Sequence, residues 1–202
     1  MALVEAQDLS KLRAWKLPPD RYSNRCSSLT PASASFLDRI GAWQHLDRDR
    51  VQPYHEMQVW DGVSGARIEF DSPPTHGGTI AYMIENLNLT SGLLKRLDEL
   101  GGVAVYDSSR VEHITFGEET DEVDLRQWPV VHLSSGAQLA ARLLVGADGA
   151  NSPVRTFAGI QARGWDYDRH GVVATLQLSE STPSTFKTAY QRFLPTGPVA
   201  LL

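Results

Sequence analysis

The sequence of 202 residues has a single cysteine, Cys26, which excludes an internal disulfide bond and any metal site built on several cysteines. Its six histidines are scattered along the chain, without the short spacing at which metal ligands usually occur. We therefore assign no metal ion to this chain. Cys26 itself is expected to be a small, packed side chain.

The sequence also lacks any cluster of lysine and arginine, and 19 basic against 24 acidic residues give a net charge of -5. A nucleic acid is therefore not expected as a partner. No apolar run approaches the roughly 20 residues that span a bilayer. Residues 1–5 show no basic segment before an apolar core, so they do not form a signal peptide.

A third absence concerns glycine. The pattern Gly-x-Gly-x-x-Gly, which binds the diphosphate of a dinucleotide at a strand-to-helix turn, does not occur in the chain. Both ends of the chain lie in apolar, strand-like runs that have neither a helix cap nor a polar tail. Because a strand that is cut leaves its neighbours unpaired, we expect the chain to be a piece of a longer protein.

The patterns that are present mix helices and strands. Helices are expected from Thr30-Pro31 to Gly41, from Leu89 to Leu100 and from Pro153 to Gly159, where caps and apolar spacing coincide. Strands are expected at 2–5, 55–60, 66–70, 79–84, 103–106, 110–116, 129–133, 138–145, 170–178, 190–194 and from 197 onward. Residues 72–78 are expected to form a loop. The first strand is expected to be buried and to end at an acid, Glu5. The fold class is therefore α/β.

The most informative stretch is 143–155, where an apolar run is followed by Gly146-Ala147-Asp148-Gly149 and then by a helix start, at which either Asn151 or Ser152 can cap and Pro153 suits the first position. It predicts a buried strand, a tight turn that carries one carboxylate, and a helix N-terminus. A diphosphate or a polyol could approach the main chain of such a turn. The same pattern is also that of a plain strand-to-helix turn with a capping aspartate, and the residues alone leave both interpretations open.

Seven blocks of the sequence share one order with a known family. They are 2–6, 23–33, 41–43, 57–62, 84–86, 146–155 and 192–202. Together they resemble the ubiquinone-biosynthesis flavin hydroxylases, which are relatives of para-hydroxybenzoate hydroxylase, and among these the mitochondrial coenzyme Q hydroxylases of fungi. The resemblance covers nearly the whole chain, truncated at both ends. It implies part of an FAD-binding Rossmann-like fold with an interleaved β-sheet substrate domain.

The resemblance also implies which residues serve the cofactor. The main FAD-binding part would comprise 1–53, 79–116 and 129–160, and the substrate part 54–78 and 161–202. The cofactor residues would be Glu5, Arg25, Asn86, Val111, Asp148 and Gly149. Glu5 would bind the adenosine ribose, and Arg25 a phosphate or ribose. The main chain at Val111 would border the adenine.

Two further positions would lie near the middle of the cofactor. By the same resemblance, Asn86 begins a helix near the ribityl chain and the diphosphate, and Asp148 with Gly149 faces the same region. Arg155 is expected to support its helix only. No catalytic residue is nominated, and the side chains of His170, Tyr190 and Arg192 are expected to lie on a sheet surface.

The function implied by the resemblance is FAD-dependent hydroxylation of the aromatic ring of a polyprenylated phenol in ubiquinone biosynthesis. O2 and an electron donor, either a ferredoxin system or NADPH, would take part. The protein would lie peripherally on the matrix face of the mitochondrial inner membrane, with a ubiquinone-synthesis complex as a candidate partner. The alternatives are an NADPH-dependent small-phenol hydroxylase of the same fold and a non-catalytic fragment that acts only in complex assembly.

Two motifs of the family are absent from the sequence, namely Gly-x-Gly-x-x-Gly and a later motif of the Gly-Asp-Ala-Ala-His type. The first of these would cradle the cofactor's diphosphate. We therefore expect this chain alone to bind FAD poorly or not at all.

Overall fold

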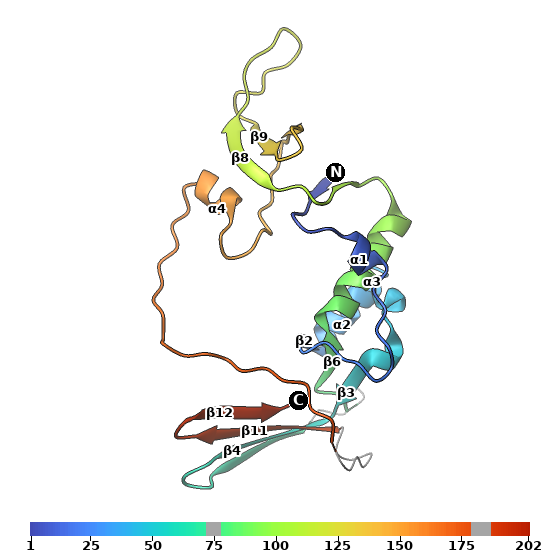
Figure 1. The fold of residues 1–202 in the computed structure, drawn as a ribbon, viewed down its shortest axis with the longest axis vertical. Helices are drawn as coiled ribbons and strands as arrows, with labels where there is room; N and C mark the ends of the chain where they lie inside the picture. The colour runs from blue at the N-terminus through green and yellow to red at the C-terminus, as the bar shows by residue number, and fades with distance from the viewer. Residues whose placement is uncertain (72–77, 179–186) are drawn as a thin grey trace. The chain divides into compact units, whose positions relative to one another are not determined.

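The structure is a computed structural model that describes residues 1–71, 78–178 and 187–202 (Figure 1). The chain divides into two compact units, each made of two stretches that lie far apart in the sequence. The first comprises Met1–Ser10 and Gly102–Gly171, and the second comprises Lys11–Gly101 and Val172–Leu202. The predicted division into cofactor and substrate parts concerns what each part binds, so it stays a prediction.

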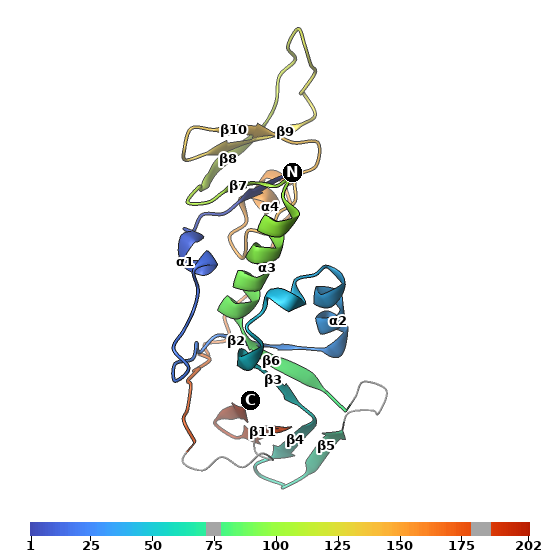
Figure 2. The same cartoon turned by 90° about the vertical axis from the view of Figure 1, so that its right-hand side faces the viewer.

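The first unit is built on short strands. Its elements are β1 (Ala2–Val4), β7 (Ala104–Tyr106), β8 (Val111–Phe116), β9 (Pro129–Leu133), β10 (Gln138–Ala140) and α4 (Pro153–Phe157). Strands β1 and β7 pair in parallel, with Leu3 opposite Val105. Strands β8, β9 and β10 form an antiparallel sheet in the order β10-β9-β8 (Figure 2). Val131 and Leu133 on β9 are the buried side chains of this sheet.

The second unit contains two sheets and the longest helix. Its helices are α2 (Pro31–Arg39) and α3 (Asn86–Leu100), with 3-10 turns η1 (Trp43–His45) and η2 (Arg48–Arg50), and α1 (Ser10–Arg13) spans the unit boundary. Its strands are β2 (Cys26–Leu29), β3 (Val51–Tyr54), β4 (Glu56–Asp61), β5 (Arg67–Asp71), β6 (Ala81–Glu85), β11 (Thr188–Leu194) and β12 (Gly197–Leu201). One sheet has the order β2-β6-β3 and the other β12-β11-β4-β5. Tyr54, Ala81 and Ala189 form a buried cluster between them.

Local sequence signals explain where the helices of the second unit begin and end. The Thr30 hydroxyl accepts the Ser33 N–H at the start of α2, with Pro31 in the first turn as predicted. Gly101 ends α3 with φ 65°, a left-handed conformation that favours glycine, and its N–H donates to the Leu97 carbonyl. Together with the sheets described above, these helices confirm the mixed α/β fold expected from the sequence.

The helix predicted at 89–100 from its apolar spacing is confirmed as α3, and its buried face consists largely of small and polar residues. Its buried residues are Asn88, Ser91, Gly92 and Leu94. Leu93 is 38% exposed and Leu100 is 62% exposed. A Cβ atom at Gly92 would lie 2.5 Å from Cδ2 of Leu46, so the helix packs closely through a glycine that the hydrophobic pattern does not show.

Three strand predictions are wrong in detail. Strand β1 forms, but Leu3 is 40% exposed rather than buried. The run before Gly146 does not form a strand, and Leu143 and Val145 are 80% and 73% exposed. Among the described residues, no strand pairs with this run. Strand β1, in the same unit, pairs with β7 alone. A strand forms where its backbone groups pair with a neighbouring strand, and this run has no such neighbour in the described part of the chain. Residues 170–178 are also irregular.

Residues 72–77 of the loop expected at 72–78 lie outside the described residues. Within the described ranges, no helix is long and apolar enough to cross a membrane.

Candidate cofactor site

The six cofactor residues predicted from the sequence divide between the two units. Glu5, Val111, Asp148 and Gly149 belong to the first unit, and Arg25 and Asn86 belong to the second. Each group is therefore described within its own unit.

Glu5 lies at the end of β1 and is held mainly through its backbone. Its N–H donates to the Tyr106 carbonyl at 2.9 Å, and its own carbonyl accepts the Ser109 N–H at 3.0 Å. The Glu5 carboxylate accepts the Gln7 N–H at 2.8 Å, which closes a turn after the strand. Val111 begins β8 two residues after Ser109, so the fold brings the chain around Glu5 and the chain leading to Val111 together.

Asp148 organises the turn before α4. Its carboxylate accepts the Val154 N–H at 3.2 Å, and a hydrogen bond from the Ser152 side chain holds the pKa of Asp148 below its usual value. The Ser152 hydroxyl in turn accepts the Arg155 N–H at 3.0 Å, as expected of a helix cap. The capping interpretation of this turn is therefore confirmed, and a contact of Asp148 with a cofactor stays a prediction.

The two glycines of the turn have different roles. A Cβ atom at Gly146 would lie 2.8 Å from Cβ of Val154, so glycine allows the turn to approach the helix. Gly149 has φ +83°, and a Cβ atom there would meet nothing within 4 Å. The main chain at Gly149 therefore borders open space, as a ligand-facing turn requires.

Arg25 and Asn86 are brought together in the second unit. Asn86 is the first residue of α3, and its N–H donates to the Arg25 carbonyl at 2.9 Å. The Asn86 side-chain oxygen accepts the Ser27 hydroxyl at 2.6 Å, which fixes the amide. The contact arises because β2, which follows Arg25, pairs with β6, which precedes Asn86, with Cys26 opposite Glu85.

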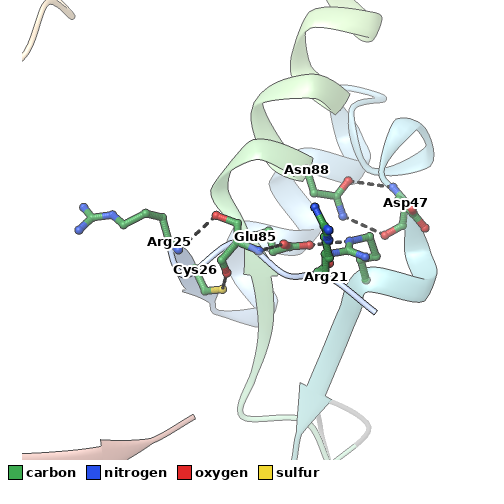
Figure 3. A network of polar contacts seen from close by, with 8 residues as sticks. Arg21, Arg25, Cys26, Asp47, Glu85 and Asn88 are labelled. Carbon is green, nitrogen blue, oxygen red and sulfur yellow. Dashed lines mark hydrogen bonds and ion pairs between the residues drawn. The ribbon is translucent and has the colours of Figure 1, made fainter. Parts of the chain in front are cut away.

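The Arg25 side chain is exposed and extends away from the polar network around it (Figure 3). Within the described ranges it makes no hydrogen bond or ion pair. Its backbone is nevertheless fixed, through its carbonyl on Asn86 and through its N–H, which donates to the Ser23 hydroxyl at 3.3 Å. The arrangement thus presents a free guanidinium from an anchored main chain.

A buried ion pair beside Arg25 was missed by the sequence analysis. Arg50 Nε lies 2.6 Å from Glu85 Oε2, and the two side chains are 7% and 4% exposed. The hydrogen bond to Glu85 raises the pKa of Arg50. The one available signal was an acid that ends the otherwise apolar run Ala81–Glu85, and nothing in the sequence indicated its partner.

A second buried polar residue, Asn88, fixes the loop before β3. Its side-chain amide donates to the Asp47 carbonyl and accepts the Asp47 N–H, both at 2.9 Å (Figure 3). The sequence analysis missed this residue also. Because Asn88 is 2% exposed, this pair of bonds holds α3 firmly against the loop.

The expectation for Cys26 is wrong, because the residue is exposed. Its thiol donates to the Ser23 carbonyl at 3.5 Å. Partial desolvation, and secondarily the negative charge of Glu85, raises the pKa of the Cys26 thiol. In the described part of the chain, there is no group of three or more His, Cys, Asp and Glu side chains that could hold a metal ion.

Tyr190 and Arg192 lie on β11, in the sheet of the second unit. The Tyr190 ring meets Trp60 edge to face at 6.3 Å, and Arg192 is opposite Trp60 in the parallel pairing of β11 with β4. His170 lies in the irregular segment rather than in a strand.

Comparison with known proteins identifies what these features resemble. The family model described as "FAD binding domain" matches residues 16–194. A ubiquinone biosynthesis monooxygenase of Xenopus tropicalis is 42% identical over 91% of this chain and 39% of its own length. The mitochondrial proteins of the same name from Saccharomyces cerevisiae and Schizosaccharomyces pombe are 39% and 36% identical over 99% and 100% of this chain, each over 41% of its own length.

Solved structures show the same fold. A probable FAD-dependent monooxygenase from Pseudomonas aeruginosa superposes with a TM-score of 0.58 at 23% identity, over 82% of this chain and 40% of that one. Klebsiella pneumoniae HpxO, solved with FAD and uric acid, superposes with a TM-score of 0.59 at 14% identity, over 100% of this chain and 52% of that one. The sequence resemblance to the ubiquinone-biosynthesis enzymes is confirmed by these findings. The chain spans about two fifths of the length of the curated relatives it matches.

Proposed function

This chain belongs to the FAD-binding domain family, and we propose from that premise that it supplies part of the FAD site of a ubiquinone-biosynthesis monooxygenase. The relatives that match it over 91–100% of its length are mitochondrial monooxygenases of that name. In the proposed reaction the aromatic ring of a polyprenylated phenol is hydroxylated. FAD, when bound, supplies the redox chemistry with O2, and the chain's own residues bind and orient it.

The observation that carries this proposal is Arg25, whose carbonyl accepts the N–H of Asn86 at the start of α3 and whose exposed guanidinium makes no hydrogen bond or ion pair in the described part of the chain. A guanidinium is suited to bidentate contact with phosphate oxygens. Helix α3 has 15 residues, and its first N–H groups favour negative charge. These groups of the second unit would suit the diphosphate of FAD.

Other residues have proposed roles within the first unit. Glu5 would accept hydrogen bonds from ribose hydroxyls, and the main chain at Val111 would border the adenine. Asp148 would keep the turn in shape through its bond to Val154, while the Gly149 main chain faces the cofactor.

We further propose a place and partners for the complete protein. It would lie peripherally at the matrix face of the mitochondrial inner membrane, receive electrons from a ferredoxin system or NADPH, and associate with a ubiquinone-synthesis complex. The names of the relatives, which are mitochondrial ubiquinone biosynthesis monooxygenases, support mitochondrial location and ubiquinone biosynthesis.

A chimera tests the function. The segment of the Saccharomyces cerevisiae relative that matches this chain is replaced by this chain, and the chimera is expressed in yeast that lacks its own protein. We expect restored ubiquinone, measured by mass spectrometry of lipid extracts, and loss of that ubiquinone in an Arg25→Ala chimera. A chimera that accumulates and binds FAD yet restores no ubiquinone would refute the hydroxylase role. It would favour the fragment that acts only in assembly.

A further inference from the structure

We propose that Arg50 and Glu85 are positioning residues for the cofactor: their buried ion pair holds residues 21–25 in place so that Arg25 stands beside the first turn of α3. The inference rests on the proposed function, because it assigns the Arg25 guanidinium to FAD. In this proposal neither residue contacts the cofactor. Their effect is transmitted through three backbone hydrogen bonds.

Arg50 makes contacts with the chain before Arg25 at several points. Its Nη2 donates to the Arg21 carbonyl at 2.6 Å, while its Nε serves Glu85. Its guanidinium carbon lies 4.6 Å from the centre of the Tyr22 ring and 5.6 Å from that of Trp15. A single buried guanidinium thus contacts two aromatic rings by cation–π geometry and one carbonyl by a hydrogen bond, although Tyr22 itself is 57% exposed.

Glu85 continues the attachment toward Arg25. One carboxylate oxygen, Oε2, accepts from Arg50, and the other, Oε1, accepts the Ser23 N–H. The next residue, Asn86, donates its N–H to the Arg25 carbonyl. The segment is therefore held at residues 21, 23 and 25 in succession. It has no helix or strand bonds of its own. Its other hydrogen bonds, such as those from the Arg21 N–H to the Pro18 carbonyl and from the Arg25 N–H to the Ser23 hydroxyl, are local, so these three bonds are what tie the segment to residues far along the chain.

The energetics of buried ion pairs favour a positioning role over a purely stabilising one. Removing two charges from water costs several kcal/mol per ion, and an apolar pair of similar volume is often as stable or more stable. An apolar pair could not accept a hydrogen bond from the Ser23 N–H, and it could not donate one to the Arg21 carbonyl. The pair thus gives this segment directional bonds that packing alone would not.

The same unit contains a natural control. Arg96 and Glu99 on α3 also form an ion pair, with Nη1 2.6 Å from Oε2, and Arg96 Nε donates to the Ile40 carbonyl at 2.7 Å. This second arginine likewise joins an acid and a loop carbonyl. It makes no contact with residues 21–25 in the described part of the chain.

The test uses the yeast chimera described above, which contains the complete FAD site, and five variants of it: Arg50→Lys, Glu85→Gln, Arg25→Ala, Arg96→Lys and the double variant R25A/R50K. Two quantities are measured. The first is the hydrogen exchange rate of the peptides that contain Ser23 and Asn86, followed by mass spectrometry, and the second is the dissociation constant of FAD, measured by flavin fluorescence.

We expect Arg50→Lys and Glu85→Gln to speed exchange at Ser23 and Asn86 by at least about tenfold, while amides in β9 of the first unit are unchanged. Both variants are expected to weaken FAD binding about as much as Arg25→Ala. The double variant R25A/R50K is expected to bind FAD no more weakly than R25A, because the change at Arg50 affects FAD binding only through the position of Arg25. Arg96→Lys is expected to change neither quantity.

Other outcomes separate this inference from the proposed function. If FAD binding is weakened by Arg25→Ala but not by Arg50→Lys or Glu85→Gln, the positioning role is overturned and the FAD role stands. Additive losses in R25A/R50K would also overturn it. If Arg25→Ala leaves FAD binding by the chimera unchanged, the FAD role of Arg25 is overturned and the inference with it. Should Arg50→Lys fail to fold, Glu85→Gln alone decides, because it keeps the shape of the side chain and removes its charge and one of its two acceptor oxygens.

Discussion

Replacement of Gly92 by alanine sets two effects of opposite sign against each other in α3. Alanine in a helix interior is favoured over glycine by about 1 kcal/mol. The new Cβ atom, however, would lie 2.5 Å from Cδ2 of Leu46. Leu46 is 5% exposed, so its methyl group has to move by about 1 Å, within a packed interior, to reach an ordinary carbon–carbon contact.

Overpacking of this kind costs about 1–3 kcal/mol. We therefore expect Gly92→Ala to lower the free energy of unfolding by up to about 2 kcal/mol, since the helix gain offsets only part of the cost. The matched background is Leu46→Ala, which removes the obstructing methyl groups at a cost of its own of about 2–5 kcal/mol. In that background Gly92→Ala should raise stability by up to about 1 kcal/mol.

The assay is urea unfolding of the four proteins of this cycle, followed by far-ultraviolet circular dichroism. The expected signature is a change of sign: alanine at position 92 is destabilising with Leu46 present and stabilising without it. If alanine stabilises the chain equally in both backgrounds, the close packing of α3 against Leu46 is refuted.

Three further predictions concern charged and titrating groups. Glu85→Ala leaves the Arg50 guanidinium buried and unpaired, so urea unfolding should show a loss of about 3–5 kcal/mol; a loss below 1 kcal/mol would contradict the burial of the pair. The folded-state pKa of Asp148 lies below its unfolded value, so its contribution to stability is complete above an unfolded pKa of about 3.9 and is lost as the pH falls through the folded value. The protection factors of the helix amides at 154–156, which correct for the pH dependence of intrinsic exchange, should therefore fall on acidification in the unaltered chain, and Asp148→Asn should remove that pH dependence; an unchanged profile would argue against the cap. The raised pKa of Cys26 predicts that its thiol reacts slowly with a disulfide reagent at pH 7 although the residue is exposed. Glu85→Gln should speed this reaction, because it removes a negative charge near the thiol. Equal rates in the two proteins would show that the Glu85 charge does not affect the pKa of the thiol.

Short-range signals in the sequence were reliable where the structure depends on a few adjacent residues. The start of α2 at Thr30-Pro31 and the end of α3 at Gly101 follow from hydrogen bonds within one helical turn. The cap at Ser152 is equally local. The residues of the candidate site were named through ordered sequence blocks, and the pairing of β2 with β6 then placed Arg25 against Asn86.

Predictions that depended on distant neighbours failed. The apolar run at Leu143 and Val145 has the composition of a buried strand, but burial requires strands beside it, and none pairs there within the described residues. The close contact of α3 with Leu46 was likewise not predicted, because it is made through Gly92 rather than through a large side chain.

By itself the sequence determined the family, the α/β character and the helix ends, because each of these is encoded in residues that lie near one another or recur in a fixed order. Only the tertiary structure decided that Arg50 meets Glu85 and that the pair fastens residues 21–25. These residues come from three separate stretches of the chain. A charge in one stretch does not indicate its partner in another until the strands have paired and both side chains have left water.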